Sequence, residues 1–179
     1  MDEDPVVVTG AGGFVGRALV AHFTSLGRPF RAIVRGQDRT SAPKPHVFAV
    51  ADLATAPDDE LDAIVTAAAA VVHLAGRAHV QRETTTDPAA AYVSANVTAT
   101  QRVARAAVRA GVRRFVLASS IKVNGETSAM GRPLCPSDPT DPRDDYARSK
   151  LGAEALLATI AAGTPMAPIV LRLDRKSVV

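Results

Sequence analysis

The sequence predicts an α/β protein built on a doubly wound parallel sheet with helices on both faces. Short apolar runs alternate with segments whose apolar residues recur at helical spacing, from residue 6 almost to the end of the 179 residues. Parallel strands need crossover connections, and the crossover helices cover the sheet. The composition agrees, because 47% of the residues are hydrophobic but only 4% are aromatic, which suits an aliphatic core beneath closely packed helices.

Each expected element has a local reason. The strands are short runs rich in Val, Ile, Leu and Phe, and the first ends in a tight glycine turn. The third helix begins at Asp87 and Pro88 and stops at Gly111, because Pro at the first helical position and Gly after the last are usual helix signals. Residues 124–141 form a loop rich in Gly, Pro and Asp, and the acids at 138–145 belong to this solvated loop and to the start of the last helix. The expected strands are 6–8, 30–34, 46–50, 71–74, 115–118 and 169–173, and the expected helices are 14–26, 61–70, 87–111 and 144–162.

Composition and charge exclude several classes of protein. The 21 basic residues are scattered among 18 acids, without the charge runs that mark a nucleic-acid surface. The longest uncharged run, 155–171, contains Gly163, Pro165 and Pro168, so it does not span a membrane as one helix. The single cysteine, Cys135, cannot form an internal disulfide and fits a reducing compartment. We therefore expect a cytoplasmic protein with no nucleic-acid or membrane partner. No metal site is expected, because none of the four histidines is spaced from a cysteine or an acid as metal ligands are. The histidines are His22, His46, His73 and His79.

Three glycines, Gly10, Gly13 and Gly16, form a G-x-x-G-x-x-G pattern between the first strand and the first helix. In this place glycines permit a tight turn, a close approach of the backbone to a pyrophosphate, and close packing of helix on strand. The N–H groups of Phe14 and Val15 lie at the positive end of the helix dipole, where they would bind phosphates. The pattern predicts a dinucleotide site, with an ordinary glycine-rich turn as the alternative.

The residue after the second strand bears on the choice between NAD and NADP. Dinucleotide sites often carry an acid there, which binds the adenosine ribose. Here Arg35 follows Val34, and its guanidinium could bind a 2′-phosphate, which favours NADP. Asp38 is a weaker candidate for ribose binding, and a solvated surface role is the alternative for Arg35. The cofactor is therefore expected to be NAD or NADP.

Tyr146 and Lys150 are four residues apart and so share one face of the last expected helix. Interconversion of an alcohol and a ketone needs a base near neutral pH, whereas the pKa of a free Tyr is about 10. A nearby cation lowers such a pKa by about 1–3 units, so Lys150 could supply much of the change and a positively charged nicotinamide the rest. Ser119 and Ser120 end the fifth expected strand, at the edge where doubly wound sheets bind ligands. Together these residues predict one reactive crevice, with a coincidental Tyr-x-x-x-Lys spacing on a helix surface as the alternative.

With these motifs, residues 6–173 resemble the short-chain dehydrogenase/reductase superfamily, and within it the extended branch of NAD(P)-dependent epimerases and dehydratases of nucleotide sugars. The turn at 9–16 is similar to the cofactor motif of that branch. The segment 119–125, Ser-Ser-Ile-Lys-Val-Asn-Gly, is similar to its Ser-rich segment, which usually closes in Val-Tyr-Gly. Asn124 therefore departs from the pattern, as does Ala99 where the helix often has Gly. Other matching positions are Asp52-Leu53, His73-Leu74-Ala75-Gly76, Asn96-Val97, Tyr146 and Lys150.

The resemblance implies a Rossmann fold and a Ser-Tyr-Lys catalytic site. In such a site Tyr146 takes or returns the proton of a sugar hydroxyl, Ser120 holds that oxygen, and Lys150 binds the nicotinamide ribose and lowers the pKa of the Tyr. The resemblance also implies a nucleotide-sugar substrate, with 4-epimerases and 4-keto reductases of polysaccharide synthesis as the favoured members, and a homodimer through the helix that carries Tyr146. Together with Arg35, the expected cofactor-binding residues are Gly10, Gly13, Phe14, Val15, Gly16, Asp52, Leu53, Leu74, Ala75, Gly76, Asn96, Tyr146 and Lys150.

Two other functions stay open at this point. One is an NADP-dependent ketone reductase of the same superfamily, which Arg35 favours. The other is a non-catalytic dinucleotide-binding protein, which would not need Ser120, Tyr146 and Lys150.

The domain organisation follows from the same resemblance. The expected domain is 1–173, and a non-native tail is expected at 174–179, because GATCGGAAGAGCGTCGTG, a string similar to a sequencing-library adapter, would encode those residues. Family members continue from the last strand into a substrate-binding domain. We therefore expect the chain to hold the cofactor-binding portion, without the substrate-binding domain, and to be inactive alone if that domain is required.

Overall fold

The computed structural model describes residues 4–36, 46–78, 85–128 and 131–174. Three sequence-based expectations concern positions outside these ranges: the weaker ribose candidate Asp38, the histidine at His79, and residues 175–179 of the expected tail.

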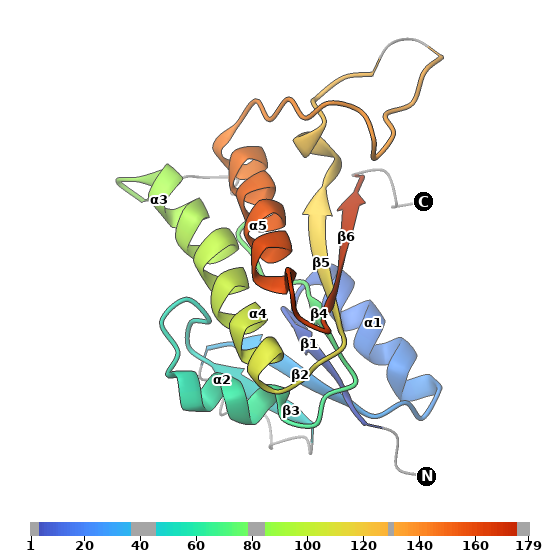
Figure 1. Ribbon diagram of the computed structural model, residues 1–179, viewed down its shortest axis with the longest axis vertical. Coiled ribbons are helices and arrows are strands. Elements are labelled where there is room, and N and C mark those ends of the chain that lie inside the picture. Colours follow the sequence, from blue (N-terminus) through green and yellow to red (C-terminus); the bar gives the residue numbers. More distant parts are fainter. Residues whose placement is uncertain (1–3, 37–45, 79–84, 129–130, 175–179) are drawn as a thin grey trace.

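Six parallel strands form one sheet in the order β3-β2-β1-β4-β5-β6 (Figure 1). This confirms the predicted fold class and all six predicted strands. The chain order reverses between β1 and β4, which are hydrogen-bonded neighbours. In sheets of this kind, ligands bind outside the carboxyl ends of the strands at such a reversal. The strands are β1 Val6–Thr9, β2 Phe30–Arg35, β3 Val47–Val50, β4 Ala70–His73, β5 Arg114–Ser120 and β6 Ala167–Leu173.

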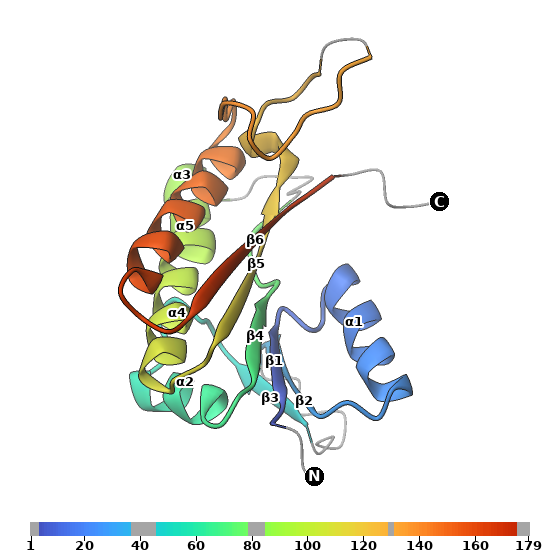
Figure 2. The same ribbon diagram turned by 45° about the vertical axis from the view of Figure 1, so that its right-hand side comes forward.

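Helices lie on the two faces of the sheet (Figure 2). One face carries α1, and the other carries α2, α4 and α5, with the short α3 beside the N-terminal end of α5. No helix in the described part of the chain is long and apolar enough to cross a membrane. The bounds are α1 Phe14–Ser25, α2 Asp58–Val65, α3 Pro88–Tyr92, α4 Ala99–Arg109 and α5 Asp145–Ala161, with a π-helical turn η1 at Val93–Thr98 and a 3-10 turn η2 at Ile121–Val123.

The core has two apolar layers, one on each face of the sheet. The larger layer lies between the sheet and α2, α4 and α5, where Val103, Phe115 and Leu157 are completely or almost completely buried. The smaller layer lies under α1, where Leu19 and Phe23 pack on the other face. Each fully buried side chain of this size stabilises the fold by roughly 1.5–3 kcal/mol, so these layers hold the strand ends in fixed positions.

The expected coverage of both faces holds for only part of the sheet. α1 contacts β1 and β2, whereas α5 contacts β5 and β6 from the opposite face. The edge strand β6 is left partly uncovered, and four of its apolar side chains are 37–45% exposed: Ile169, Val170, Leu171 and Leu173.

The second expected helix, 61–70, is misplaced relative to α2. The helix begins at Asp58, because Asp58, Asp59 and Glu60 place three acids in its first turn, where the helix dipole favours negative charge. It ends at Val65, because Thr66 is extended and Ala67 has a φ of 53°. The chain then enters β4 at Ala70, one residue earlier than expected.

The long helix expected at 87–111 is interrupted by the π-helical turn. Asp87 caps its start as predicted, since its carboxylate accepts the N–H of Ala90 at 2.9 Å. The turn Val93–Thr98 contains the buried Asn96, whose side chain makes its hydrogen bonds outside the helix. Such turns are frequent at functional sites, and this one faces the loop that follows β4.

Candidate functional site

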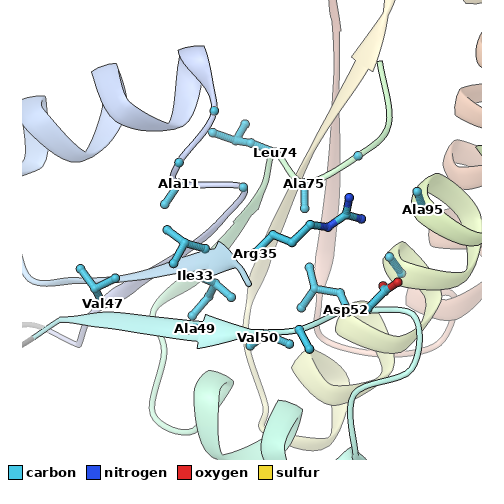
Figure 3. A pocket seen from close by; sticks show the side chains of 18 of the residues that line it. Ala11, Ile33, Arg35, Val47, Ala49, Val50, Asp52, Leu74, Ala75 and Ala95 are labelled. Carbon is cyan, nitrogen blue, oxygen red and sulfur yellow. The ribbon is translucent and has the colours of Figure 1, made fainter. Parts of the chain in front are cut away.

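A cleft of about 1120 Å³ opens at the carboxyl ends of β1, β2, β3 and β4 (Figure 3). Its walls come from the glycine turn after β1, the ends of β2 and β3, and the loop after β4. Eight of the residues predicted to bind the cofactor line it: Gly10, Gly13, Arg35, Asp52, Leu53, Leu74, Ala75 and Gly76.

The glycine turn is built by close approaches of the backbone. Gly10 has a φ of 68°, and a Cβ atom there would lie 2.6 Å from the backbone nitrogen of Ala75. A Cβ atom at Gly16 would overlap the carbonyl oxygen of Gly10, so Gly16 lets α1 pack on the turn. Gly13 is the N-cap of α1 and has no side chain to bond the first N–H groups of the helix. Phe14 and Val15, the next two residues, are exposed. The turn therefore presents unshielded N–H groups, which is the arrangement that binds phosphates.

Charged side chains lie at the far end of the cleft. Figure 3 shows Arg35, at the end of β2, and Asp52, just after β3, both directed into the opening. Asp52 also accepts the N–H of Ala54 at 2.8 Å, which fixes its loop. Arg17, from the first turn of α1, lines the same cleft. Sequence reasoning missed Arg17, although its place one residue after Gly16 puts it beside the turn.

A buried polar pair fixes the loop after β4. The hydroxyl of Thr9 bonds Nδ1 of His73 at 2.8 Å, and it accepts the N–H of Ala75 at 3.2 Å. Burial, with a smaller contribution from the charge of Lys150, lowers the pKa of His73 to about 3. His73 is therefore neutral near pH 7, and with Thr9 it ties the cleft-lining Ala75 to the end of β1.

Asn96 lies behind the loop after β4 and does not itself line the cleft. Its side-chain oxygen accepts the N–H of Arg77 at 2.8 Å, and its amide donates to the carbonyl of Arg77 at 3.1 Å. The same amide donates to the hydroxyl of Ser149 at 2.8 Å, and that hydroxyl donates to the carbonyl of Tyr146 at 2.7 Å. Asn96 thus joins the cleft loop to the helix that carries Tyr146 and Lys150.

Ser120, Tyr146 and Lys150 come together at the neighbouring strand end. Ser120 is the last residue of β5, and its hydroxyl is hydrogen-bonded to the phenol of Tyr146. Lys150 is buried and donates to the carbonyl of Ala118 at 2.9 Å. A Cβ atom at Gly76 would lie 3.1 Å from Nζ of Lys150. The wall of the cleft therefore comes close to Lys150 at Gly76.

Burial dominates the electrostatics of these residues. It lowers the pKa of Lys150 to about 8, against the opposing charge of Glu154. It also raises the pKa of Tyr146 above its usual value, and the hydrogen bond with Ser120 only partly opposes this. The charge of Lys122 also lowers the pKa of this phenol, whereas the charge of Asp144 raises it.

Ser119 joins a different hydrogen-bond network. Its hydroxyl donates to the buried carboxylate of Glu154, which also pairs with Arg172 at 2.7 Å. Arg172 in turn donates to the side-chain oxygen of Asn124 at 3.0 Å. Of the two serines, Ser120 is therefore the one beside Tyr146. Asn124, which departs from the usual Tyr, is held by the arginine of β6.

Comparison with known proteins agrees with this geometry. Residues 6–175 match the model of the NAD dependent epimerase/dehydratase family. The chain is 37% identical over 169 residues to a UDP-glucose 4-epimerase of Vibrio cholerae, and this alignment covers 93% of this chain and 50% of the relative. It is 32% identical over 167 residues to a dTDP-glucose 4,6-dehydratase of Streptomyces antibioticus, with 84% of this chain and 47% of the relative covered.

A solved structure has the same fold. MoeE5 in complex with UDP-glucose and NAD has a TM-score of 0.78 and 32% sequence identity, and the match covers 94% of this chain and 53% of that one. The chain spans about half the length of the curated relatives it matches. The match of the family model to almost the whole length shows that this chain belongs to the NAD dependent epimerase/dehydratase family.

Proposed function

We propose that this chain is the cofactor-binding portion of an NAD(P)-dependent oxidoreductase of the epimerase/dehydratase type, which acts on a nucleotide sugar by hydride transfer at Ser120, Tyr146 and Lys150. One observation carries the proposal. Gly76 lines the cleft, and a Cβ atom there would lie 3.1 Å from Nζ of Lys150, so the proposed cofactor cleft adjoins the proposed reactive groups. The epimerase, the dehydratase and the UDP-glucose complex among the similar proteins support the substrate class.

The residues of the cleft fit a dinucleotide. The cradle between Gly10, Gly16 and Ala75 has no room for a side chain, and the N-terminus of α1 beside it is open. We assign the pyrophosphate to the N–H groups of Phe14 and Val15, and the adenosine end to Asp52, Leu53 and Arg35. When bound, NAD(P) supplies a nicotinamide ring that accepts or returns a hydride.

The chain's own residues would handle the proton. In this proposal the phenol oxygen of Tyr146 takes the proton of a sugar hydroxyl and later returns it. The Ser120 hydroxyl, already bonded to that phenol, orients the reacting oxygen. The loop after β4, fixed by Thr9, His73 and Asn96, brings the cofactor site against Lys150.

A second candidate function is an NADP-dependent ketone reductase of the same superfamily. Arg35 favours this function, because its guanidinium group points into the cleft where a 2′-phosphate would bind. A non-catalytic nucleotide-binding role is a weaker candidate, because it does not require the hydrogen bond between Ser120 and Tyr146.

Thermal unfolding with NAD and with NADP tests the proposal on this chain directly. We expect at least one of them to raise the Tm, since a ligand that binds only the folded state stabilises it. Gly13→Glu places a negative charge where the pyrophosphate would bind and should abolish the rise. Ala21→Glu adds the same charge to the exposed part of α1 and should keep it. The absence of any rise with either cofactor in the unsubstituted chain would refute the cofactor assignment.

A further inference from the structure

Lys122 lies directly beside the proposed reactive site, in the 3-10 turn that follows Ser120. Its backbone N–H donates to the Ser120 hydroxyl at 3.3 Å. Its ammonium group donates to Asp144 at 2.5 Å and to Glu126 at 3.1 Å. The hydrogen bond with Asp144 is the main cause of a raised pKa at Lys122, so this side chain stays positively charged. A permanent cation is therefore held between two carboxylates, one turn of chain away from Ser120.

Asp144 is bound by the same turn and by α5. One carboxylate oxygen accepts the N–H of Ala147 at 2.6 Å, which caps the helix two residues before Tyr146. Burial by itself raises the pKa of Asp144, but the hydrogen bonds from Lys122 and Ala147 outweigh it and hold the pKa below its ordinary value. An ionised carboxylate thus stands close to the phenol whose ionisation the proposed reaction requires.

The charges around Tyr146 come from several elements. Asp144 at the start of α5 raises the pKa of the phenol, and Lys122 of η2 lowers it. Tyr92 of α3 packs against Tyr146 with ring centroids 6.0 Å apart, and the guanidinium of Arg77 lies 5.3 Å from the centre of the Tyr92 ring.

Three further charged groups, Asp145, Arg148 and Lys150, lie along the same helix. Arg148 pairs with Asp145 at 2.8 Å on the exposed side. Lys150 is turned to the carbonyl of Ala118. Of the charged side chains described here, Asp144 and Lys122 shift the pKa of the phenol in opposite directions.

We propose that Lys122 is a positioning residue for proton transfer at Tyr146: its ammonium group neutralises the Asp144 carboxylate beside the phenol, and its backbone N–H orients the Ser120 hydroxyl. This inference rests on the proposed function and deepens it, because it names the residue that offsets a negative charge at the reacting oxygen. Without Lys122, only the hydrogen bond with Ser120 would offset the effect of the carboxylate on the phenol.

The proposal requires effects of opposite sign from the two partners. Removing the ammonium with Lys122→Met should raise the pKa of Tyr146. Removing the carboxylate with Asp144→Asn should lower it, and Asn still caps a helix. The double variant should lie between the two single variants. Because both side chains are partly exposed, each single shift is expected to be about 0.3 unit or more at low salt, below the 1–3 units of fully buried pairs.

The chain allows a direct measurement, since it contains two tyrosines and no tryptophan. NMR of the chain labelled with ¹³C at the tyrosine ring would follow both phenols during a pH titration, and Tyr92→Phe assigns the remaining signal to Tyr146. Glu126→Gln is the matched control, because it also removes a partner of Lys122 but Glu126 is not among the groups that shift the pKa of the phenol, so a smaller shift is expected. Lys122→Arg keeps the charge and should restore most of the original titration.

The titration decides the proposal without turnover or cofactor. Opposite shifts for Lys122→Met and Asp144→Asn support it, and shifts of the same sign or no shift in either variant overturn it. If Lys122→Met does not fold by circular dichroism, Asp144→Asn alone decides, with a downward shift in support and an unchanged titration against. A failure of the proposed function would show differently, as unchanged turnover after Tyr146→Phe.

Discussion

The backbone of Gly76 lies so close to Lys150 that an added Cβ atom would stand 3.1 Å from Nζ. Gly76 belongs to the wall of the cleft, and Lys150 belongs to the helix that carries Tyr146. This contact joins two sequence motifs, one after β4 and one in α5, into a single site. It also explains why a side chain at Gly76 would damage both halves of the site at once.

Gly76→Ala tests this contact. The new Cβ would lie 2.6 Å from the side-chain oxygen of Asn96 and 3.1 Å from Nζ of Lys150, so the Asn96 side chain or the loop must shift. We expect a loss of about 1–3 kcal/mol in the free energy of unfolding, and weaker cofactor binding by calorimetry. Gly12→Ala is the control, because its Cβ would make only an ordinary contact, 3.7 Å from Val34. Equal behaviour of the two variants would contradict the account of this loop.

Lys150→Met tests the buried ammonium group. Between pH 8 and 10.5 the folded chain holds Lys150 largely neutral, while the unfolded chain keeps it protonated. The unfolded state therefore binds more protons, and Lys150 makes the free energy of unfolding rise with pH across this window, on the order of 3 kcal/mol in total. Urea unfolding at several pH values should show a flatter rise in the variant.

Lys122→Met is the control for the range between pH 8 and 10.5. The pKa of Lys122 is raised above its ordinary value, so Lys122 loses its proton above this range. Identical pH slopes for Lys150→Met and the unsubstituted chain would show that Lys150 is not held neutral by burial.

Arg35→Asp tests the choice of cofactor. Arg35 opens into the cleft at the end of β2, where it would meet a 2′-phosphate, and an aspartate there would repel the phosphate and favour a ribose hydroxyl. Calorimetric titration should show NADP binding weakened at least about tenfold more than NAD binding. Equal losses for both cofactors would remove the 2′-phosphate role from Arg35.

Much of the fold could be predicted from local patterns. The six strands are confirmed because each is a short apolar run, and the helix starts at Asp87 and Asp144 follow from capping chemistry. The end of β5 was less predictable. It continues through Ser120 because β6 pairs with it as far as Leu173, a contact that no local pattern records.

The parts that were missed depend on contacts between distant segments. The π-helical turn contains Asn96, which bonds Arg77 and Ser149, 19 and 53 residues away in the sequence. The ion pair between Lys122 and Asp144 joins residues 22 positions apart in the sequence. Asp144 is therefore held by an ion pair, although the acids of this segment were expected to be solvated. The glycine turn and the placement of Tyr146 and Lys150 on one helix could be predicted, because the residues of each motif are only three or four positions apart in the sequence.

Tyr146→Phe, made in an active protein that contains these residues, tests the proposed role of the phenol in proton transfer. The hydroxyl lost in this variant is the one bonded to Ser120, and the ring that packs on Tyr92 is kept. Turnover of nucleotide sugars and NAD(P) affinity should be measured on the same preparation. We expect turnover to fall by at least about a hundredfold while cofactor affinity stays nearly unchanged. Unchanged turnover would contradict the assignment of Tyr146 as the proton-transfer residue.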